Sequence, residues 1–268
     1  MMSGNLNDGN HGSPIAVIAA LPEEIRPFLR RLPHVETRQS GGVTLREGTL
    51  GPERVVVAVT GDGAIRAARS LTVILDAVRP RAILGVGIAG ALTPGLSVGD
   101  LLVSERVCAW RGSWFEPDGE LLARALASGP PSVRGTVVTS DRILVNAGER
   151  AHVGRFLGKS GEAAVDMESA EWARVATDRG TPWLVVRSIS ETAVEDLPDY
   201  LPKCLRADGS LSRLRVVQRA GLQPRSIPAL IEMRRRLHRS GIALADYLQM
   251  FLHRMMDHPV GRALGARS

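Results

Sequence analysis

Short apolar runs alternate with amphipathic stretches from residue 15 to residue 190. Residues 15–20 form an apolar run of strand length, whereas residues 64–78 place apolar side chains at helical spacing. Two β-branched runs, 43–50 and 54–60, are joined by Gly51-Pro52 and predict a hairpin. The same reasoning predicts strands at residues 82–87, 99–107, 134–140, 163–166 and 183–190, and helices at residues 22–32, 121–127, 149–157 and 167–179.

Strands that alternate with helices are typical of α/β proteins, because a helix usually carries the chain from one parallel strand to the next. We therefore expect a three-layer sandwich. Its centre is a mixed, largely parallel twisted sheet, and helices flank both faces. The domain organisation predicted from this pattern is a disordered polar leader at residues 1–13, a catalytic domain at residues 14–210 and a basic helical extension at residues 211–268.

The C-terminal part of the chain has its own pattern. After residue 190 a proline-punctuated connection leads to residue 228, and two helices are predicted at residues 228–239 and 242–256, separated by Ser240-Gly241. The second helix carries a broad apolar face. Such a face needs a partner, either the sandwich, another subunit or a surface that carries lipid.

The charge of the chain is confined to this C-terminal segment. The 268 residues have a net charge of +6, but residues 211–268 hold 11 arginines and three acidic residues, so the preceding 210 residues have a net charge of −2. No apolar run approaches the roughly 20 residues that span a membrane, and the polar N-terminus lacks the features of a signal peptide. Two distant cysteines predict neither a disulfide scaffold nor a metal site. We expect a cytoplasmic protein, peripheral to the inner membrane face if the basic segment binds lipid.

Two glycine-rich segments are placed where a ligand could bind. Gly61-Asp62-Gly63 precedes a predicted helix, whose free amides and positive dipole end suit an anion or a sugar hydroxyl. Gly85, Gly87 and Gly90 form a G-x-G-x-x-G pattern, but Thr93-Pro94-Gly95 interrupts the helix that a dinucleotide site requires. We expect a tight glycine turn at the carboxyl end of a strand, with close packing under a helix as the alternative.

Charged side chains follow two of the predicted strands. Asp166 is expected to cap the next helix, and Glu168 is expected to point into the crevice at the sheet end. Arg187 lies within a buried strand and needs a partner, either a carboxylate or a bound anion. Ser190 and Glu191 end the same strand. These residues predict a polar site at the carboxyl edge of the sheet.

Six short motifs resemble, in order, those of the nucleoside phosphorylase superfamily, and most closely its methylthioadenosine/S-adenosylhomocysteine nucleosidase branch. They are IAALPEE at 18–24, GDG at 61–63, GVGIAGA at 85–91, VGD at 98–100, VDME at 165–168 and VRSISE at 186–191. The resemblance spans about residues 14–195. It implies a single-domain α/β sandwich that cleaves the N-glycosidic bond of a purine nucleoside. It also implies a homodimer or larger assembly with no metal and no redox cofactor.

The resemblance also implies roles for single residues. Glu24 takes the place of the carboxylate that orients the attacking water, and Met167 and Glu168 match the pair that packs under the ribose and binds its hydroxyls. Ser190 and Glu191 fall where the family has the Ser-Asp pair that protonates the leaving purine. Because Glu191 is one methylene longer than aspartate, it must retract or the base must sit further out. Asp196 is the alternative acid.

The remaining substrate contacts are implied by the same motifs. Residues 141–144 align with the segment that lines the base, where Ile143 replaces the aromatic residue that the nucleosidases favour and Leu144 follows it. The glycine segments contribute Gly61, Gly87, Ala89 and Gly90, and Arg187 is expected to bind the nucleophile.

Hydrolysis is the first prediction for the reaction. Breaking the C1′–N9 bond produces an oxocarbenium-like sugar, and a general acid such as Glu191 protonates the departing base if burial raises its pKa. The carboxylate of Glu24 favours water over phosphate as nucleophile, because two negative groups repel each other. Phosphorolysis, with inorganic phosphate as co-substrate held by Arg26 or Arg187, is the alternative.

Three further interpretations remain open at this stage. The C-terminal segment resembles that of hopanoid-associated phosphorylases, which act on adenosylhopane. This favours a lipid-linked nucleoside as substrate. A protein that binds nucleosides without cleaving them is the second interpretation. A nucleic-acid binder that uses the basic segment is the third, although the interleaved aromatics of such proteins are missing, so no nucleic-acid partner is expected.

Overall fold

The computed structural model describes residues 12–127, 131–158, 161–204, 206, 212–222, 225 and 227–257. The predicted leader therefore lies, apart from residues 12 and 13, outside the described residues. The strands are β1 Ile15–Ala19, β2 Glu36–Ser40, β3 Val43–Leu50, β4 Glu53–Val59, β5 Ala82–Ala91, β6 Leu101–Ala109, β7 Trp114–Phe115, β8 Ser132–Thr139, β9 Glu162–Asp166 and β10 Trp183–Glu191. The helices are α1 Pro22–Leu29, α2 Ala64–Val78, α3 Gly119–Ala127, α4 Ala147–Phe156, α5 Ser169–Asp178, the short 3-10 helix Pro202–Cys204, α6 Arg213–Leu222 and α7 Ile227–Asp257.

The strands form one ten-stranded sheet, part of which closes into a barrel. The closed ring runs from β5 through β10, β6, β8 and β9 back to β5, and β1, β4, β3 and β2 extend from β5 as an arm. Among the described strands, five pairings are parallel and five are antiparallel. The sheet is mixed, as expected, but the expectation that it is largely parallel is not confirmed.

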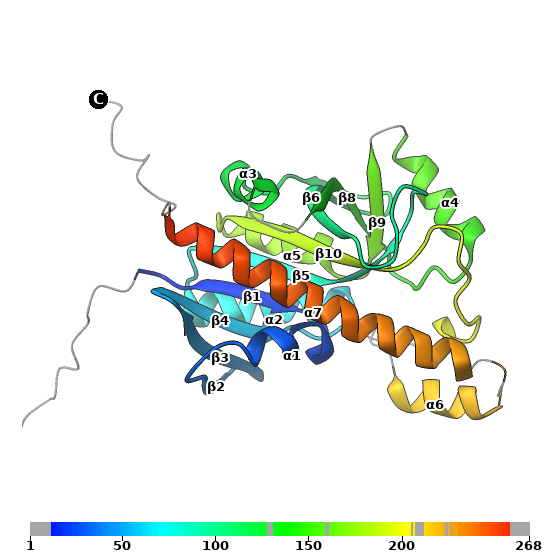
Figure 1. The fold of residues 1–268 in the computed structure, drawn as a ribbon, viewed down its shortest axis with the longest axis horizontal. Helices are drawn as coiled ribbons and strands as arrows, with labels where there is room; N and C mark the ends of the chain where they lie inside the picture. The colour runs from blue at the N-terminus through cyan, green and yellow to red at the C-terminus, as the bar shows by residue number, and fades with distance from the viewer. Residues whose placement is uncertain are drawn as a thin grey trace, which may run out of the picture.

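Helices cover both faces of the sheet, which gives the predicted helix–sheet–helix layering (Figure 1). The alternation of side chains along each strand explains this: Ile15 and Val17 of β1 join the core under α1, α3 and α7, whereas Ala16 and Ile18 join the core under α2 and α5. Both faces are thus apolar, so both need helices. The polar side chains at the ends of the strands are therefore the candidates for a functional site.

The glycine-rich segment of residues 85–90 lies inside strand β5, which continues to Ala91. The predicted turn at this point was therefore wrong. The strand continues because Gly90 pairs with Val165 of β9, and residues 83–90 pair with β10. The glycines of this strand instead allow neighbouring side chains to pack close to its backbone. A Cβ at Gly85 would lie 2.9 Å from the ring of Trp172. Packing under a helix, the alternative interpretation, accounts for Gly85.

The two predicted C-terminal helices are one continuous helix, α7. Ser240-Gly241 does not interrupt it, because Gly241 lies at the crossing with α1, where a Cβ would come within 2.9 Å of the Glu23 carbonyl oxygen. The apolar face beyond this point, including Leu244, Leu248 and Phe251, is buried in the core with α1 and the sheet. The apolar face of this part of α7 therefore packs against the sandwich.

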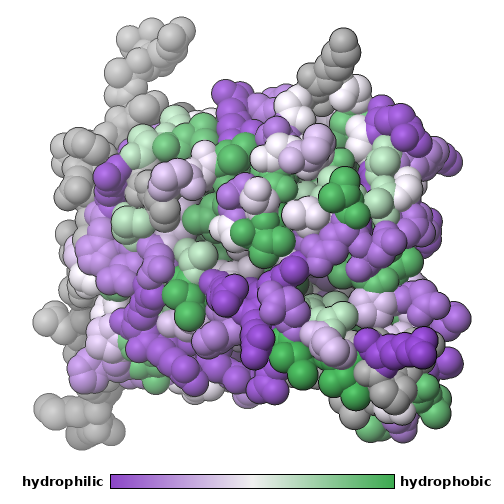
Figure 2. All heavy atoms as spheres, turned by 45° about the vertical axis from the view of Figure 1, so that its right-hand side comes forward, coloured by the Kyte–Doolittle hydropathy of each residue, from purple (hydrophilic) through white to green (hydrophobic). Residues whose placement is uncertain are grey.

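The other end of the extension is more exposed. Leu214 and Leu222 of α6 and Ile231 of α7 face solvent. Figure 2 shows a face on which small groups of hydrophobic side chains lie among hydrophilic ones. Within the described residues, no helix is both long and apolar enough to cross a membrane. The domain boundaries at residues 14–210 and 211–268 stay a prediction.

Candidate active site

Glu24 stands in the first turn of helix α1, which starts directly after strand β1. Its side chain is buried, and its two oxygens accept hydrogen bonds from backbone amides, Leu21 at 2.8 Å and Ile88 at 2.9 Å. Burial raises the pKa of Glu24, and the charge of Arg187 acts in the opposite direction. A carboxylate that is fixed in this way and has a raised pKa is suited to accept a proton near neutral pH.

Arg187 is wholly buried in β10, and the partner that the sequence required is Asp166, with which it forms an ion pair. Ser169 accepts hydrogen bonds from Nη2 at 2.7 Å and from Nε at 3.2 Å, and the guanidinium lies over the ring of Trp172, 4.9 Å from its centroid. The third nitrogen, Nη1, has no hydrogen-bond partner among the described residues. Arg187 is therefore held in place with the N–H groups of Nη1 left for a ligand.

Nη1 of Arg187 and Oε1 of Glu24 both lie near the position that a Cβ on Gly87 would occupy. A Cβ on Gly87 would overlap Nη1 of Arg187 and would lie 2.8 Å from Oε1 of Glu24. One of these atoms donates a hydrogen bond and the other accepts one. Because Gly87 has no Cβ, a buried donor of Arg187 and a buried acceptor of Glu24 lie close together at this point of β5.

Replacing Gly87 by alanine should displace this pair. The added methyl group overlaps the guanidinium, so we expect kcat/KM for the nucleoside cleavage that the sequence motifs imply to fall by about 100-fold, as when reacting groups move by 1 Å. Stability should fall by about 1–3 kcal/mol from overpacking. Initial rates and thermal unfolding measure both effects. Gly119→Ala, with nothing within 4 Å of its Cβ, is the control, and equal rates for the two variants would contradict this placement.

Glu168 stands in the turn between β9 and α5. Helix α5 begins at Ser169, two residues later than predicted. Oε1 of Glu168 accepts a hydrogen bond from the amide of Gly63 at 2.8 Å. Gly61 and Gly63 both have left-handed φ angles, 84° and 87°, which position this amide. The free amide expected at the glycine turn is therefore occupied by Glu168. Burial and the neighbouring Asp166 raise the pKa of Glu168 to about 8.

Asp166 holds the turn that carries Met167 and Glu168. Its carboxylate accepts from the amide of Ser169, the first residue of α5, at 3.2 Å, and from the hydroxyl of Thr139 at 2.7 Å. The N-cap residue of α5 is Glu168, so the expectation that Asp166 occupies the cap position was wrong. Sequence reasoning missed Thr139 and Ser169, since neither residue type is distinctive after a strand. The need of Arg187 for a carboxylate was the only signal that pointed to this network.

Ser190 and Glu191 end β10 next to Gly90 and Ala89. The hydroxyl of Ser190 donates to Oε2 of Glu191 and lies 3.3 Å from the Ala89 carbonyl oxygen, and a Cβ on Gly90 would be 2.6 Å from Oε1 of Glu191. The longer side chain is thus folded back against β5. Burial raises the pKa of Glu191, whereas the Ser190 hydroxyl lowers it. Asp196, the alternative acid, is exposed and accepts from the amide of Ala147 at 2.9 Å.

Two polar clusters therefore lie along the second half of β5. The first surrounds Gly87 and the second surrounds Gly90, three residues further along the strand.

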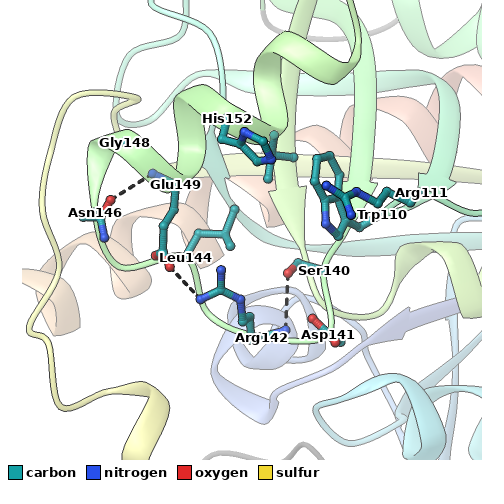
Figure 3. A pocket seen from close by; sticks show the side chains of 11 residues that line it. Trp110, Arg111, Ser140, Asp141, Arg142, Leu144, Asn146, Gly148, Glu149 and His152 are labelled. Atoms are coloured by element: carbon teal, nitrogen blue, oxygen red, sulfur yellow. Dashed lines mark hydrogen bonds and ion pairs between the residues drawn. The ribbon is translucent and has the colours of Figure 1, made fainter.

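A cavity of about 620 Å³ adjoins the segment predicted to line the base (Figure 3). Ser140, Asp141 and Leu144 line it from one side, and Trp110 and His152, whose rings are 5.8 Å apart, line it from the other. Leu144 lies at this cavity as the motif implies. Ile143 instead packs against the cluster of Tyr200, Leu201 and Cys204. An aromatic side chain is thus present near this segment, from Trp110 rather than from position 143.

Comparison with known proteins places these residues in a family. Residues 14–208 match the model of the phosphorylase superfamily. The chain belongs to the phosphorylase superfamily. The match covers both clusters and includes every predicted site residue from Glu24 to Glu191. Within the described residues of this superfamily member, no group of three or more His, Cys, Asp or Glu side chains could hold a metal ion.

Among similar proteins of the superfamily are 5′-methylthioadenosine/S-adenosylhomocysteine nucleosidases. That of Listeria welshimeri is 28% identical over 206 residues, covering 68% of this chain and 88% of the relative. That of Geobacillus kaustophilus is 29% identical over 203 residues, covering 68% and 85%. The solved Campylobacter jejuni nucleosidase has the same fold, with a TM-score of 0.72 at 19% identity over 91% of this chain and 100% of that one. A futalosine hydrolase mutant of Helicobacter pylori gives a TM-score of 0.70 at 22% identity over 90% and 99%.

Proposed function

We propose that this chain hydrolyses the N-glycosidic bond of a purine nucleoside, with adenine as the base. The observation that carries the proposal is the paired placement of Glu24 Oε1 and Arg187 Nη1 over Gly87. The resemblance to nucleosidases that take methylthioadenosine and S-adenosylhomocysteine supports adenine as the base.

In the proposed reaction, three carboxyl groups act on different parts of the substrate. Glu168 is protonated at neutral pH in the free protein, because its pKa is about 8, and it releases this proton to solvent when substrate binds. The carboxylate then accepts hydrogen bonds from the ribose hydroxyls and opposes the positive charge that develops on the sugar. Protonated Glu191 gives its proton to the purine as the C1′–N9 bond breaks and its electron pair leaves with the base. Water held by Arg187 attacks C1′, and Glu24 takes its proton. Each group is held by hydrogen bonds of its own.

Water rather than phosphate is the nucleophile in this proposal. Oε1 of Glu24 faces the same space as the free nitrogen of Arg187, and a phosphate there would meet a negative charge in a buried site. Among the described residues, the first cluster also contains Asp166, which already neutralises Arg187. No positive charge is left over in this cluster to pair with a dianion.

Replacement of Glu24 tests this assignment. We expect Glu24→Gln to lose activity by about 10²–10⁴-fold, as for removal of a general base, on methylthioadenosine, S-adenosylhomocysteine and adenosine alike. Adenine release measures this, with and without phosphate. The phosphorolytic alternative would be favoured if the native chain released adenine only in the presence of phosphate and if Glu24→Gln kept most of that activity. Lipid-linked adenosine belongs in the same panel, because adenosylhopane is the substrate in that alternative.

Assembly and membrane contact are further predictions of this function. The exposed Leu214, Leu222 and Ile231 support a subunit contact in a homodimer or larger oligomer. The arginines of residues 211–268 support a peripheral contact with anionic lipid if the substrate is lipid-linked. No resident cofactor is proposed.

A further inference from the structure

Arg150 is a buried cation that the proposed reaction has not yet used. It lies in the first half of helix α4, and its side chain has no exposed surface. Nη1 donates to the carbonyl oxygen of Leu144 at 2.7 Å, whereas Nε and Nη2 have no hydrogen-bond partner among the residues that the structure describes. Burying a guanidinium without a carboxylate is costly, so its position calls for an explanation beyond packing.

The start of α4 is tied to the loop that follows Glu191. The amide of Ala147 donates to Asp196 at 2.9 Å, and the amide of Leu197 donates to the carbonyl oxygen of Val145 at 2.7 Å. Arg150 and Glu191 are therefore held on two segments that are fixed to each other. The charge of Arg150 lowers the pKa of Glu191, against the larger effect of burial.

The other charges that face Glu191 largely offset one another. Glu195, on the loop after β10, raises the pKa of Glu191, and Arg236 of α7 lowers it. These two residues form an ion pair with each other at 2.7 Å, and Arg236 also contacts the Ser190 carbonyl oxygen at 3.3 Å. From β5, Gly90 contributes no charge. Arg150 is thus the cation in this set whose Nε and Nη2 atoms have no hydrogen-bond partner within the described part of the chain.

We propose that Arg150 is a positioning residue for Glu191: its buried, unpaired guanidinium stabilises the carboxylate that remains after the proton has passed to the leaving base. The inference rests on the proposed function. Without a nearby cation, transfer of the proton would leave a bare carboxylate in a buried site, and the acid would be too weak to protonate the purine. Arg150 supplies the countercharge without a direct contact, so Glu191 keeps its hydrogen bond to Ser190.

The pH dependence of kcat tests this role. Glu191 acts in its protonated form, so activity is lost as the pH rises through the pKa of Glu191. Glu24 and Glu168 act in their ionised forms, so activity is lost on the acidic side as they become protonated. Removing Arg150 raises the pKa of Glu191. In Arg150→Gln we therefore expect the alkaline limb to move up by about one pH unit, and kcat at its maximum to fall by about 10–100-fold. Arg150→Lys keeps the charge and should retain a limb close to that of the native protein.

Arg155→Gln is the matched control, because Arg155 is exposed on the same helix. If Arg150→Gln does not fold, Arg150→Met replaces it, since methionine fills the space of the aliphatic stem. An alkaline limb that stays in place when the charge is removed, or that moves equally in Arg155→Gln, would overturn the inference. Glu191→Gln separates this failure from that of the proposed function: near-native activity in that variant would reject Glu191 as the acid, whatever Arg150 does.

Discussion

Replacing Glu191 by glutamine should reduce kcat/KM for adenine nucleosides by about 10²–10⁴-fold, the contribution of a positioned general acid. Glutamine keeps the size of the side chain and can still accept from Ser190, but it cannot give a proton to the base. Burial raises the pKa of Glu191, so the native side chain can hold its proton at a higher pH than an ordinary glutamate. Adenine release under kcat/KM conditions measures the loss.

A substrate with a better leaving group makes this prediction sharper. A nitrophenyl riboside needs no proton on its leaving group, so Glu191→Gln should cleave it at close to the native rate. Glu120→Gln, at an exposed ion pair with Arg124 on α3, is the control and should retain native activity on both substrates. An equal loss on the two substrates in Glu191→Gln would show that the residue does not act as the acid.

Replacing Glu168 by glutamine should lower kcat/KM by about 100-fold or more, because a charged acceptor for two ribose hydroxyls is replaced by a neutral one. The loss should be much smaller for substrates that lack both hydroxyls, such as 2′,3′-dideoxyadenosine. Near-native cleavage of every ribonucleoside by Glu168→Gln would contradict the ribose assignment.

The same variant has a predicted effect on stability. Because the pKa of Glu168 is raised to about 8, the folded chain holds a proton there that the unfolded chain releases above about pH 4.5, so the native protein loses stability as the pH rises towards 8. Glutamine does not ionise. The Tm of Glu168→Gln should therefore rise relative to that of the native protein between pH 5 and pH 9, by about 2–4 °C for each kcal/mol. A difference in Tm that does not change with pH would contradict the buried, protonated state.

Much of the fold could be predicted because strand and helix periods are local. Residues 15–20 and 183–190 were correctly expected as buried strands, and residues 64–78 form α2 as predicted. Strand β2 was missed, since Glu36–Ser40 is polar and its side chains are largely exposed, so it has no apolar face to detect. The ring closure of β5 with β10 and β9 depends on contacts between residues that are far apart in the sequence.

Two wrong predictions, the turn at residues 85–90 and the break at Ser240-Gly241, both came from glycines. Local rules associate Gly with turns and helix ends, but Gly87 lies in a strand and Gly241 in a helix, each where another group comes too close for a Cβ. In the site, motifs located Glu24, Glu168, Arg187 and Glu191. Arg150 could not be found in this way, because an arginine in a polar helix usually faces solvent and only the tertiary structure buries it.

The identity of the sugar product tests the central claim most directly. The native chain should be given methylthioadenosine in ¹⁸O-water that contains phosphate, and the sugar should be analysed by mass spectrometry. Hydrolysis at the space shared by Glu24 and Arg187 predicts free methylthioribose with one ¹⁸O at C1, at a rate independent of phosphate. A sugar 1-phosphate without solvent oxygen at C1, formed only when phosphate is present, would contradict the account.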